Sequence, residues 1–215
     1  MFTSSQIEIS TLLLKSFILG LFSSLFEDYI SQSNQVKPFY NFHFSKQDFS
    51  EYLSKNSFDY LNRTVLVKAL QSQAKLVANT SSASLAHIQL LENNNTYTVT
   101  TGHQLCLFTG PLYFIYKIAS TINLCKALQA NFTDKHFVPV YWMASEDHDF
   151  EEINHAKIYN KKVIWNSKQN GSVGEFSTEG IQEVITELKT ILGDKEKANE
   201  LISVFEKAYL KHDNL

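Results

Sequence analysis

Apolar side chains recur at helical spacing over the N-terminal part of the chain and again near its end, and two strand-like runs lie between these regions. Spacings of three and four residues place side chains on one face of a helix, whereas β-branched and aromatic runs favour strands. The pattern predicts helices over residues 9–30, 49–61, 64–91, 181–192 and 197–210, and strands over residues 97–101 and 137–143. Together these elements predict an α/β protein.

The segment between the two predicted strands carries a further helical pattern. Pro111 suits the first position of a helix, where its missing N–H costs nothing, and Gly110 is then the expected N-cap. An apolar stripe should pack on the sheet, formed by Leu112, Ile115, Ala119, Ile122 and Cys125. The second strand is almost continuously apolar, which is typical of a strand buried on both faces. Pro139 within it should lie at the strand's start or where its missing N–H would face away from a partner.

The turn from Gly102 to Gly110 is the first candidate site. A glycine-containing turn at a helix N-terminus offers free backbone N–H groups and the positive end of the helix dipole, both of which suit phosphate or carboxylate. Thr109 would be free to face a ligand, and Lys117 would add a cation one turn from Tyr113. The pattern is neither a P-loop nor G-x-G-x-x-G, so an ordinary strand-to-helix connection is the alternative.

The second candidate site follows the second strand, where five carboxylates and one imidazole fall within residues 146–152. One interpretation is a helix start capped by Ser145, with acids that favour the helix dipole. The other is a substrate site formed by Glu146, Asp147, His148 and Asp149. Acids this close repel one another, so at least one should have a raised pKa unless a cation, a substrate ammonium or a metal ion lies between them. Past this cluster, runs at residues 156–159 and 163–165 flank residues 160–162 and predict a β-hairpin.

Composition excludes some classes of protein. A net charge of −3 and a pI near 6.2 argue against a general nucleic-acid binder, which needs a basic face. The two cysteines, Cys106 and Cys125, make no disulfide framework, and reduced thiols in a cytoplasmic protein are expected. Residues 9–30 lack a basic n-region and a cleavage pattern and are interrupted by Lys15, so neither a signal peptide nor a membrane span is predicted.

Two motifs carry a resemblance to a known family. TGHQLCLFTGPLYFIYKIASTI, followed by VPVYWMASEDHDFEEINH, resembles the bacillithiol biosynthesis cysteine-adding enzyme family, the cysteine ligases of that pathway. The similarity reaches back to Asp28–Tyr29 and Pro38–Tyr40, so it covers nearly the whole chain. Two departures are visible, because the family often has Gly where Cys106 stands and Gln where His103 stands.

The resemblance implies a Rossmann-like core with a mostly parallel sheet, related to nucleotidylyltransferases, together with a helical coiled-coil arm and homodimers in the full-length form. It divides the chain into a helical N-terminal region packed on the core (1–92), a Rossmann-like half with a β-hairpin insertion (93–180) and a helical segment cut short (181–215). Family members are commonly about twice as long, so we expect this chain to be a fragment or a shortened relative, with the coiled-coil arm and the rest of the core absent.

The implied reaction joins cysteine to the amine of glucosaminyl-malate, so these two molecules and a nucleotide are the expected partners, without nucleic acid or membrane. ATP with magnesium is the candidate cofactor, and no zinc is expected. Glu146, Asp147 and Asp149 would hold an ammonium or sugar hydroxyls, and His148 is a candidate general base near neutral pH. The binding residues for the anionic ligand would be Gly102, Gln104, Thr109, Gly110, Tyr113 and Lys117.

His103 lies where class I nucleotidyl-transfer folds place their first signature histidine, and it would stabilise charge developing on a phosphate. A turn histidine bonded to backbone is the alternative. Two other functions stay open. Zinc could be held by His103, Cys106, His148 and His155 in a thiol-handling protein, although no paired-ligand spacing supports this. The chain could also be a non-catalytic substrate-binding or dimerising fragment that needs the missing half.

Overall fold

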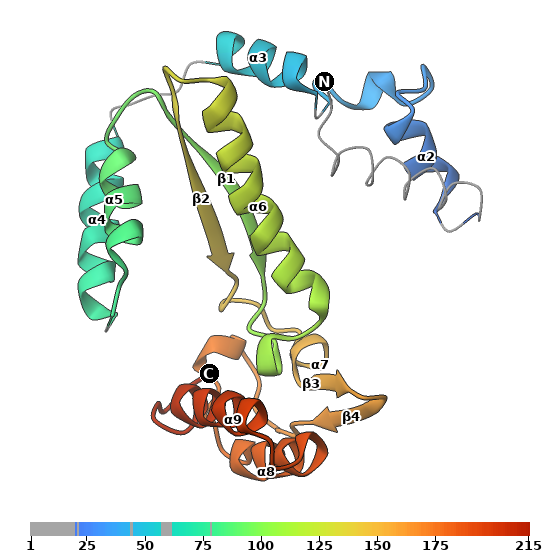
Figure 1. The fold of residues 1–215 in the computed structure, drawn as a ribbon, viewed down its shortest axis with the longest axis vertical. Coiled ribbons are helices and arrows are strands. Elements are labelled where there is room, and N and C mark those ends of the chain that lie inside the picture. The colour runs from blue at the N-terminus through green and yellow to red at the C-terminus, as the bar shows by residue number, and fades with distance from the viewer. Residues whose placement is uncertain (1–19, 21, 44, 57–61, 78) are drawn as a thin grey trace. The chain divides into compact units, whose positions relative to one another are not determined.

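The computed structural model describes residues 20, 22–43, 45–56, 62–77 and 79–215. The chain divides into two compact units, Met1–Asp59 and Tyr60–Leu215 (Figure 1). The predicted boundary between residues 92 and 93 falls inside the second unit, and the domain division based on it stays a prediction. Most of the predicted helix over residues 9–30 lies outside the described residues.

The first unit contains short capped helices. Helix α2 spans Ser24–Ile30, the 3₁₀ turn η1 spans Lys37–Phe39 and α3 spans Lys46–Lys55. The side chain of Ser45 accepts the backbone N–H of Asp48, and this N-cap starts α3 before the position that periodicity predicts. The helix predicted over residues 49–61 therefore begins earlier than expected; α3 ends at Lys55, and residues 57–61 of the predicted range lie outside the described residues.

The second unit opens with two helices where the sequence predicts one. Helix α4 spans Arg63–Leu76 and α5 spans Ser82–Leu90, so the single helix predicted over residues 64–91 is wrong. Asn79 adopts a left-handed backbone (φ 70°), and the side chain of Ser81 caps α5 by accepting the N–H of Ser84. Both residue types compete with the helix through local hydrogen bonds, which explains the break.

A two-stranded parallel sheet follows. Strand β1 spans Thr96–His103 and β2 spans His136–Met143, paired from Thr96 with His136 to His103 with Met143. Helix α6, Leu112–Asn131, connects them (Figure 1). The predicted strand–helix–strand unit is confirmed, and β1 runs on through Gly102 to His103 instead of stopping at the glycine.

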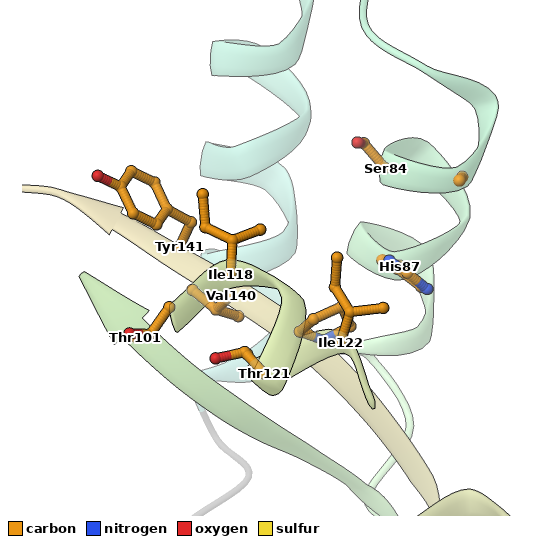
Figure 2. A pocket seen from close by; sticks show the side chains of 10 residues that line it. Ser84, His87, Thr101, Ile118, Thr121, Ile122, Val140 and Tyr141 are labelled. Atoms are coloured by element: carbon orange, nitrogen blue, oxygen red, sulfur yellow. The ribbon is translucent and has the colours of Figure 1, made fainter. Parts of the chain in front are cut away.

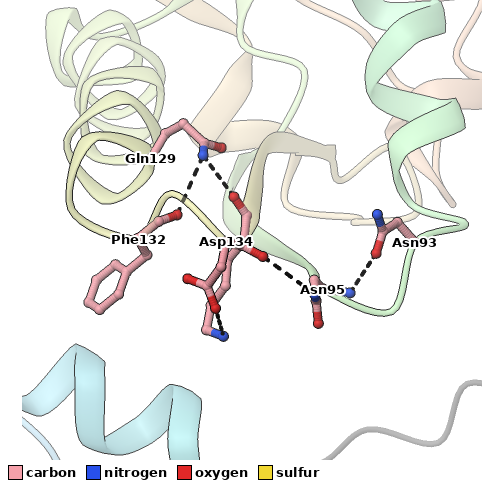
Figure 3. A network of polar contacts seen from close by, with 6 residues as sticks. Asn93, Asn95, Gln129, Phe132 and Asp134 are labelled. Carbon is pink, nitrogen blue, oxygen red and sulfur yellow. Dashed lines mark hydrogen bonds and ion pairs between the residues drawn. The ribbon is translucent and has the colours of Figure 1, made fainter.

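Polar side chains fix the register at the beginning of the two strands (Figure 3). The side-chain amide of Gln129 donates to the backbone oxygen of Lys135 at 2.7 Å, and that of Asn95 donates to the backbone oxygen of Asp134 at 3.4 Å. The N–H of His136 donates to the backbone oxygen of Asn95 at 2.9 Å. These bonds hold the end of α6 and the start of β2 beside the start of β1.

The position of Pro139 follows from this ladder. The backbone N–H of His136 donates to Asn95 and that of Ala144 donates to His103, both across to β1. Donors on a strand alternate in direction with a period of two, so the even-numbered residues of β2 face β1 and residue 139 faces away. The missing N–H of Pro139 therefore faces away from β1, one of the two positions that the sequence permitted.

Helix α6 packs on the sheet through a different face from the one predicted. Leu112 is 64% exposed, Ile115 is 50% exposed and Ile122 is 38% exposed, whereas Thr121, Cys125 and Leu128 are buried. Only Cys125 belongs to both sets. The Lys117 ammonium reaches the backbone oxygen of Gly102, and this bond turns the polar positions 117 and 121 toward the strands, displacing the apolar stripe.

The sheet has helices on both faces. Val138 and Val140 of β2 pack with Val67 of α4 and Leu91 at the end of α5. Tyr141, on the alternate face, meets Phe114 of α6 edge to face. This arrangement confirms an α/β fold with a parallel sheet. No helix in the described part of the chain combines the length and apolar character that crossing a bilayer requires.

The rest of the second unit forms the larger hydrophobic core. Its elements are α7 Phe150–Ile153, β3 His155–Ile158, β4 Lys161–Ile164, the 3₁₀ turn η3 Val173–Glu175, α8 Ile181–Leu192 and α9 Glu196–Tyr209. The predicted hairpin is confirmed, but its turn consists of Tyr159 and Asn160, both left-handed, as a two-residue hairpin requires. Trp165 is almost fully buried in the core, and its indole N–H donates to the backbone oxygen of Glu179.

Candidate functional site

The loop after β1 is folded inward. Leu107 and Phe108 of the short 3₁₀ turn η2, Leu107–Thr109, are buried in the larger core, while Thr109 is exposed. Phe108 and Thr109 have left-handed backbones (φ 51° and 69°), and Gly110 follows with φ 61°. Such conformations are costly for residues with a side chain and persist only when surrounding contacts impose them. Here the Phe108 ring packs on Phe205, and the Phe108 N–H donates to the hydroxyl of Tyr209 at 3.0 Å.

Gly110 is needed at its position for a steric reason as well. A Cβ built there would lie 2.4 Å from the Cβ of Cys106, so any side chain would clash with the loop it closes. The N-cap of α6 is Pro111, whose ψ of 149° is extended, and not Gly110 as predicted. The chain reverses at the left-handed glycine, and the proline then leads into the helix one residue later than expected.

His103 lies buried at the end of β1 with three neighbours. Its Nε2 is 2.6 Å from the Tyr113 hydroxyl, and its Nδ1 is 3.3 Å from both the backbone oxygen of Gln104 and the sulfur of Cys106. A carbonyl oxygen only accepts, so in the neutral tautomer that fits these contacts Nδ1 donates to Gln104 and Nε2 accepts from Tyr113. The bond to the Gln104 carbonyl is the contact expected of a turn histidine.

The Lys117 ammonium and the Cys106 thiol beside this loop both already have contacts in the fold. The Lys117 ammonium donates to the Gly102 oxygen at 2.5 Å and lies over the ring of Tyr113. Burial, followed by the negative charge of Glu152, raises the pKa of the Cys106 thiol to about 11. A thiol with this pKa is protonated at neutral pH and is a poor metal ligand or nucleophile. Within the described residues, no group of three or more His, Cys, Asp or Glu side chains is arranged to hold a metal ion.

The acidic loop after β2 is ordered by backbone bonds. The oxygens of Ser145 and Asp147 accept the N–H groups of Gly174 and Val173, which tie the loop to η3. The N-cap of α7 is Asp149, whose carboxylate accepts the Glu152 N–H, so the helix-start interpretation is right in kind but the predicted Ser145 cap is wrong.

The carboxylate of Asp147 is stabilised in its ionised form. The backbone N–H groups of Asp149 and His148 donate to its Oδ1 and hold the pKa of Asp147 below its usual range. For this residue the shift is opposite to the rise expected from crowded acids, because fixed N–H donors outweigh repulsion between neighbours. His148, whose side chain is 88% exposed, has its Nδ1 3.7 Å from the same oxygen.

Gln104 joins the two loops. Its side-chain Nε2 donates to Oδ2 of Asp147 at 3.0 Å and to Oε2 of Glu152 at 2.9 Å. Gln104 itself is 9% exposed. The loop after β1 and the acidic loop after β2 therefore meet at one rim, as the common direction of parallel strands requires. Glu152 was not among the predicted site residues, and only the contact across 48 positions reveals it.

The structure does not bring all predicted residues to this rim in the same way. Glu146 is exposed, and its carboxylate accepts the indole N–H of Trp142 at 3.2 Å. The ring of His155 contacts the side chain of Asn154 and not the other histidines. Tyr141 and Tyr209 were not predicted, because they belong to no motif and reach the loop after β1 only through the fold.

A small cavity of about 210 Å³ lies against the loop after β1. The residues that line it are Gln104, Leu105, Cys106, Thr109, Phe114, Tyr141, Met143, Tyr209 and Leu215. A second cavity of about 250 Å³ lies beside β2, between Ser84 and His87 of α5 and Ile118 and Thr121 of α6 (Figure 2). None of the predicted site residues lines the second cavity, so the first is the candidate site.

Comparison with known proteins now identifies the family. Residues 7–215 match the family model for the bacillithiol biosynthesis BshC N-terminal Rossmann-like domain. The chain belongs to the BshC family. It is 47% identical over 198 residues to the protein named "Putative cysteine ligase BshC" in Flavobacterium johnsoniae, 45% identical to that of Flavobacterium psychrophilum and 45% identical to that of Christiangramia forsetii. These alignments cover 91%, 91% and 90% of the chain, but only 37% of each relative. The chain thus spans little more than a third of the length of these BshC relatives.

Proposed function

We propose that this BshC-family chain contributes part of the substrate site of a cysteine ligase, which forms an amide bond between L-cysteine and the amine of glucosaminyl-malate. Family membership and the names of the relatives support ligase chemistry. The observation that carries the proposal is the bridge from Gln104 to Asp147 and Glu152, because it places the two candidate loops at one rim. Two substrates must be held side by side for an amide to form between them.

We assign the two loops to substrate groups of opposite charge. Glu146 and Asp149 are exposed acids, and we assign them, with Asp147, to hold an ammonium or sugar hydroxyls. His148 is exposed, with its Nδ1 3.7 Å from the carboxylate of Asp147, and we assign its imidazole to removing a proton from the attacking amine. On the opposite loop, the turn from Gly102 to Gly110 and Lys117 are assigned to an anionic group.

Nucleotide use, a nucleotidylyltransferase-like core, a coiled-coil arm, a homodimer and a cytoplasmic location are part of the proposal through family resemblance. ATP would activate the cysteine carboxylate. The described residues do not by themselves fit a nucleotide with magnesium: the Lys117 ammonium already donates to Gly102, and no metal-holding cluster is present in the described ranges. We therefore assign no residue to ATP and derive no step through it.

A metabolite assay tests the proposed reaction. Cells lacking the gene should accumulate glucosaminyl-malate and lose bacillithiol, and the native gene should reverse both changes. A His148→Ala gene should fail to restore bacillithiol at equal protein level, whereas His212→Ala, which changes an exposed histidine outside both loops, should restore it. Unchanged glucosaminyl-malate in the deletion strain would remove the ligase proposal.

The division between the loops has its own test. His103→Ala and Lys117→Ala variants should bind malate-bearing substrate more weakly, while His148→Ala should lose turnover without losing binding. Unchanged affinities in the first two variants would show that the loop after β1 does not hold the anion.

A second candidate is a substrate-binding or dimer-forming component without catalysis of its own. The observation in its favour is that the described residues alone do not fit a nucleotide with magnesium, because Lys117 already donates to Gly102 and the described ranges form no metal-holding cluster. Purified protein that binds glucosaminyl-malate but forms no product, and that gains turnover when the remaining polypeptide of a relative is added, would support this alternative over the ligase.

A further inference from the structure

The two N–H groups of the Gln104 side chain are both used. One donates to Asp147 and the other to Glu152, at 3.0 and 2.9 Å. Because carboxylates only accept, the amide cannot be turned around: its oxygen would then face two negative oxygens. The orientation of the amide is therefore fixed by charge, with the nitrogen toward the acids and Oε1 on the other side.

Gln104 Oε1 is left without a donor. It is buried, and among the described residues no N–H or O–H donates to it. An unsatisfied buried acceptor is costly, and native proteins nearly always pair such an atom with protein, water or ligand. Two charge-assisted bonds on the nitrogen also polarise the amide and strengthen the oxygen as an acceptor. The site is thus prepared for a hydrogen-bond donor.

Gln104 also lines the cavity of about 210 Å³, whose other walls are mostly apolar. Cys106, Phe114 and Met143 contribute sulfur and aromatic surface. No Lys, Arg or His side chain is among the lining residues, and the nearby Asp147 and Glu152 are acids. A carboxylate or phosphate would meet no cation there, whereas an ammonium would be attracted by both acids.

We propose that this cavity binds the protonated primary amine of a small thiol, with Gln104 Oε1 accepting one N–H and the thiol lying against Cys106, Phe114 and Met143. Sulfur is soft and polarizable, and it packs favourably against thioether and aromatic groups. The identification of the natural ligand as cysteine rests on the proposed function, but the preference for an amine does not. Gln104 is then a specificity residue on the amine side of the rim, not part of the anion site to which the sequence assigned it.

Two thiols that differ only in the charged group test the proposal. Cysteamine carries the amine without a carboxylate, and 3-mercaptopropionate carries the carboxylate without an amine. In calorimetric titration of the full 215-residue chain, cysteamine should bind and 3-mercaptopropionate should bind at least about tenfold more weakly, the usual worth of a charge-assisted hydrogen bond. Equal binding of the two thiols, stronger binding of the acid, or no binding of cysteamine in the millimolar range would overturn the proposal.

A variant locates the contact. Gln104→Met keeps the length of the side chain but removes the amide, and should weaken cysteamine binding about ten- to a hundredfold. The matched control is Gln182→Met on the exposed side of α8, which should leave binding unchanged. If Gln104→Met does not fold, the side-chain amide resonances of Gln104 in the native protein decide the matter. They should shift on addition of cysteamine, and a cysteamine complex that leaves them unmoved would place the amine elsewhere.

The binding experiments test the amine subsite, and the metabolite assay tests the ligase proposal, so either can fail alone. Amine-selective binding in a protein whose deletion leaves glucosaminyl-malate unchanged would keep the subsite and reject the ligase. Accumulation of glucosaminyl-malate together with no amine selectivity would keep the ligase and reject the subsite.

Discussion

The loop after β1 and the loop after β2 face the same rim, but they are held in opposite ways. The first is fixed by packing: Phe108 is buried among aromatic rings, and its strained backbone is clamped by Tyr209. The second is exposed and fixed by hydrogen bonds, most of them from backbone N–H groups to Asp147 and Ser145. One side of the rim is therefore rigid and apolar, and the other presents acids to solvent.

The largest expected effect is on the packed loop. Gly110→Ala should lower the free energy of unfolding by about 2–4 kcal/mol, since it adds both left-handed strain and a clash with Cys106. Gly193→Ala is the matched control, because Gly193 also has a positive φ but has no atom within 4 Å of the added Cβ. Urea unfolding should show a clearly smaller loss for Gly193→Ala, and equal losses would mean that the loop relaxes around the new methyl group.

The reactivity of the Cys106 thiol measures how well the same loop excludes water. With a pKa of about 11, the Cys106 thiol should be alkylated about a hundredfold more slowly at pH 8 than in the unfolded chain, where its pKa is near 9. Because the folded pKa is raised, the associated stability is complete below pH 9 and is lost as pH rises through about 11. Peptide mass spectrometry after timed iodoacetamide labelling gives the rate. A native rate close to the unfolded rate would contradict a buried, protonated thiol.

The clamp on the strained backbone should have an intermediate effect. Tyr209→Phe removes the acceptor of the Phe108 N–H and should destabilise the protein by about 1–3 kcal/mol, the range for a buried donor left unpaired. Tyr159→Phe, at a residue that is 79% exposed, should change little. Thermal unfolding of both variants against the native protein checks the difference, and two equal midpoints would show that the hydroxyl does not hold the loop.

The smallest effect belongs to the exposed loop and depends on pH. The pKa of Asp147 is lowered in the folded state, so its stabilising contribution is present above the ordinary carboxyl pKa and disappears as pH falls through the folded value. Asp147→Asn should therefore be less stable than native protein at neutral pH and equal to it in strong acid. Unfolding at a series of pH values tests this, with Glu187→Gln on α8 as the control. A difference that persists below the folded pKa would mean that the charge is not its cause.

Elements with a single clear hydrophobic period were predicted correctly from the sequence. Features that depend on contacts between residues far apart in the chain were not. The periodicity of α8 is strong, and its predicted bounds agree with the structure. The face of α6 was predicted wrongly because Lys117 reaches Gly102, a contact across 15 positions that no local pattern encodes. The break between α4 and α5 was missed although residues 79–82 are Asn-Thr-Ser-Ser, a run of turn and cap formers that interrupts the apolar spacing.

The candidate site was predictable in its location but not in its connections. Parallel strands bring their ends together, so both loops could be named from the chain alone. The pairing of Gln104 with Glu152, and the support from Tyr209, join residues 48 and 101 positions apart. Charge counting likewise could not show that backbone N–H groups lower the pKa of Asp147, because that depends on the direction of individual bonds.

Pro139 makes the two outer edges of the small sheet unequal in their capacity to pair with another strand. A strand arriving beside β2 would find a gap in the row of donors at the middle of that edge, and would lose a bond there. The outer edge of β1 carries no proline, and Thr98 and Thr100 point their N–H and C=O groups outward there. On either side of them, the carbonyl of Thr96 accepts from Arg63 and the carbonyl of Gly102 accepts from Lys117. A further strand could therefore pair with the backbone of Thr98 and Thr100 on the β1 side, whereas on the β2 side Pro139 would leave one bond unmade.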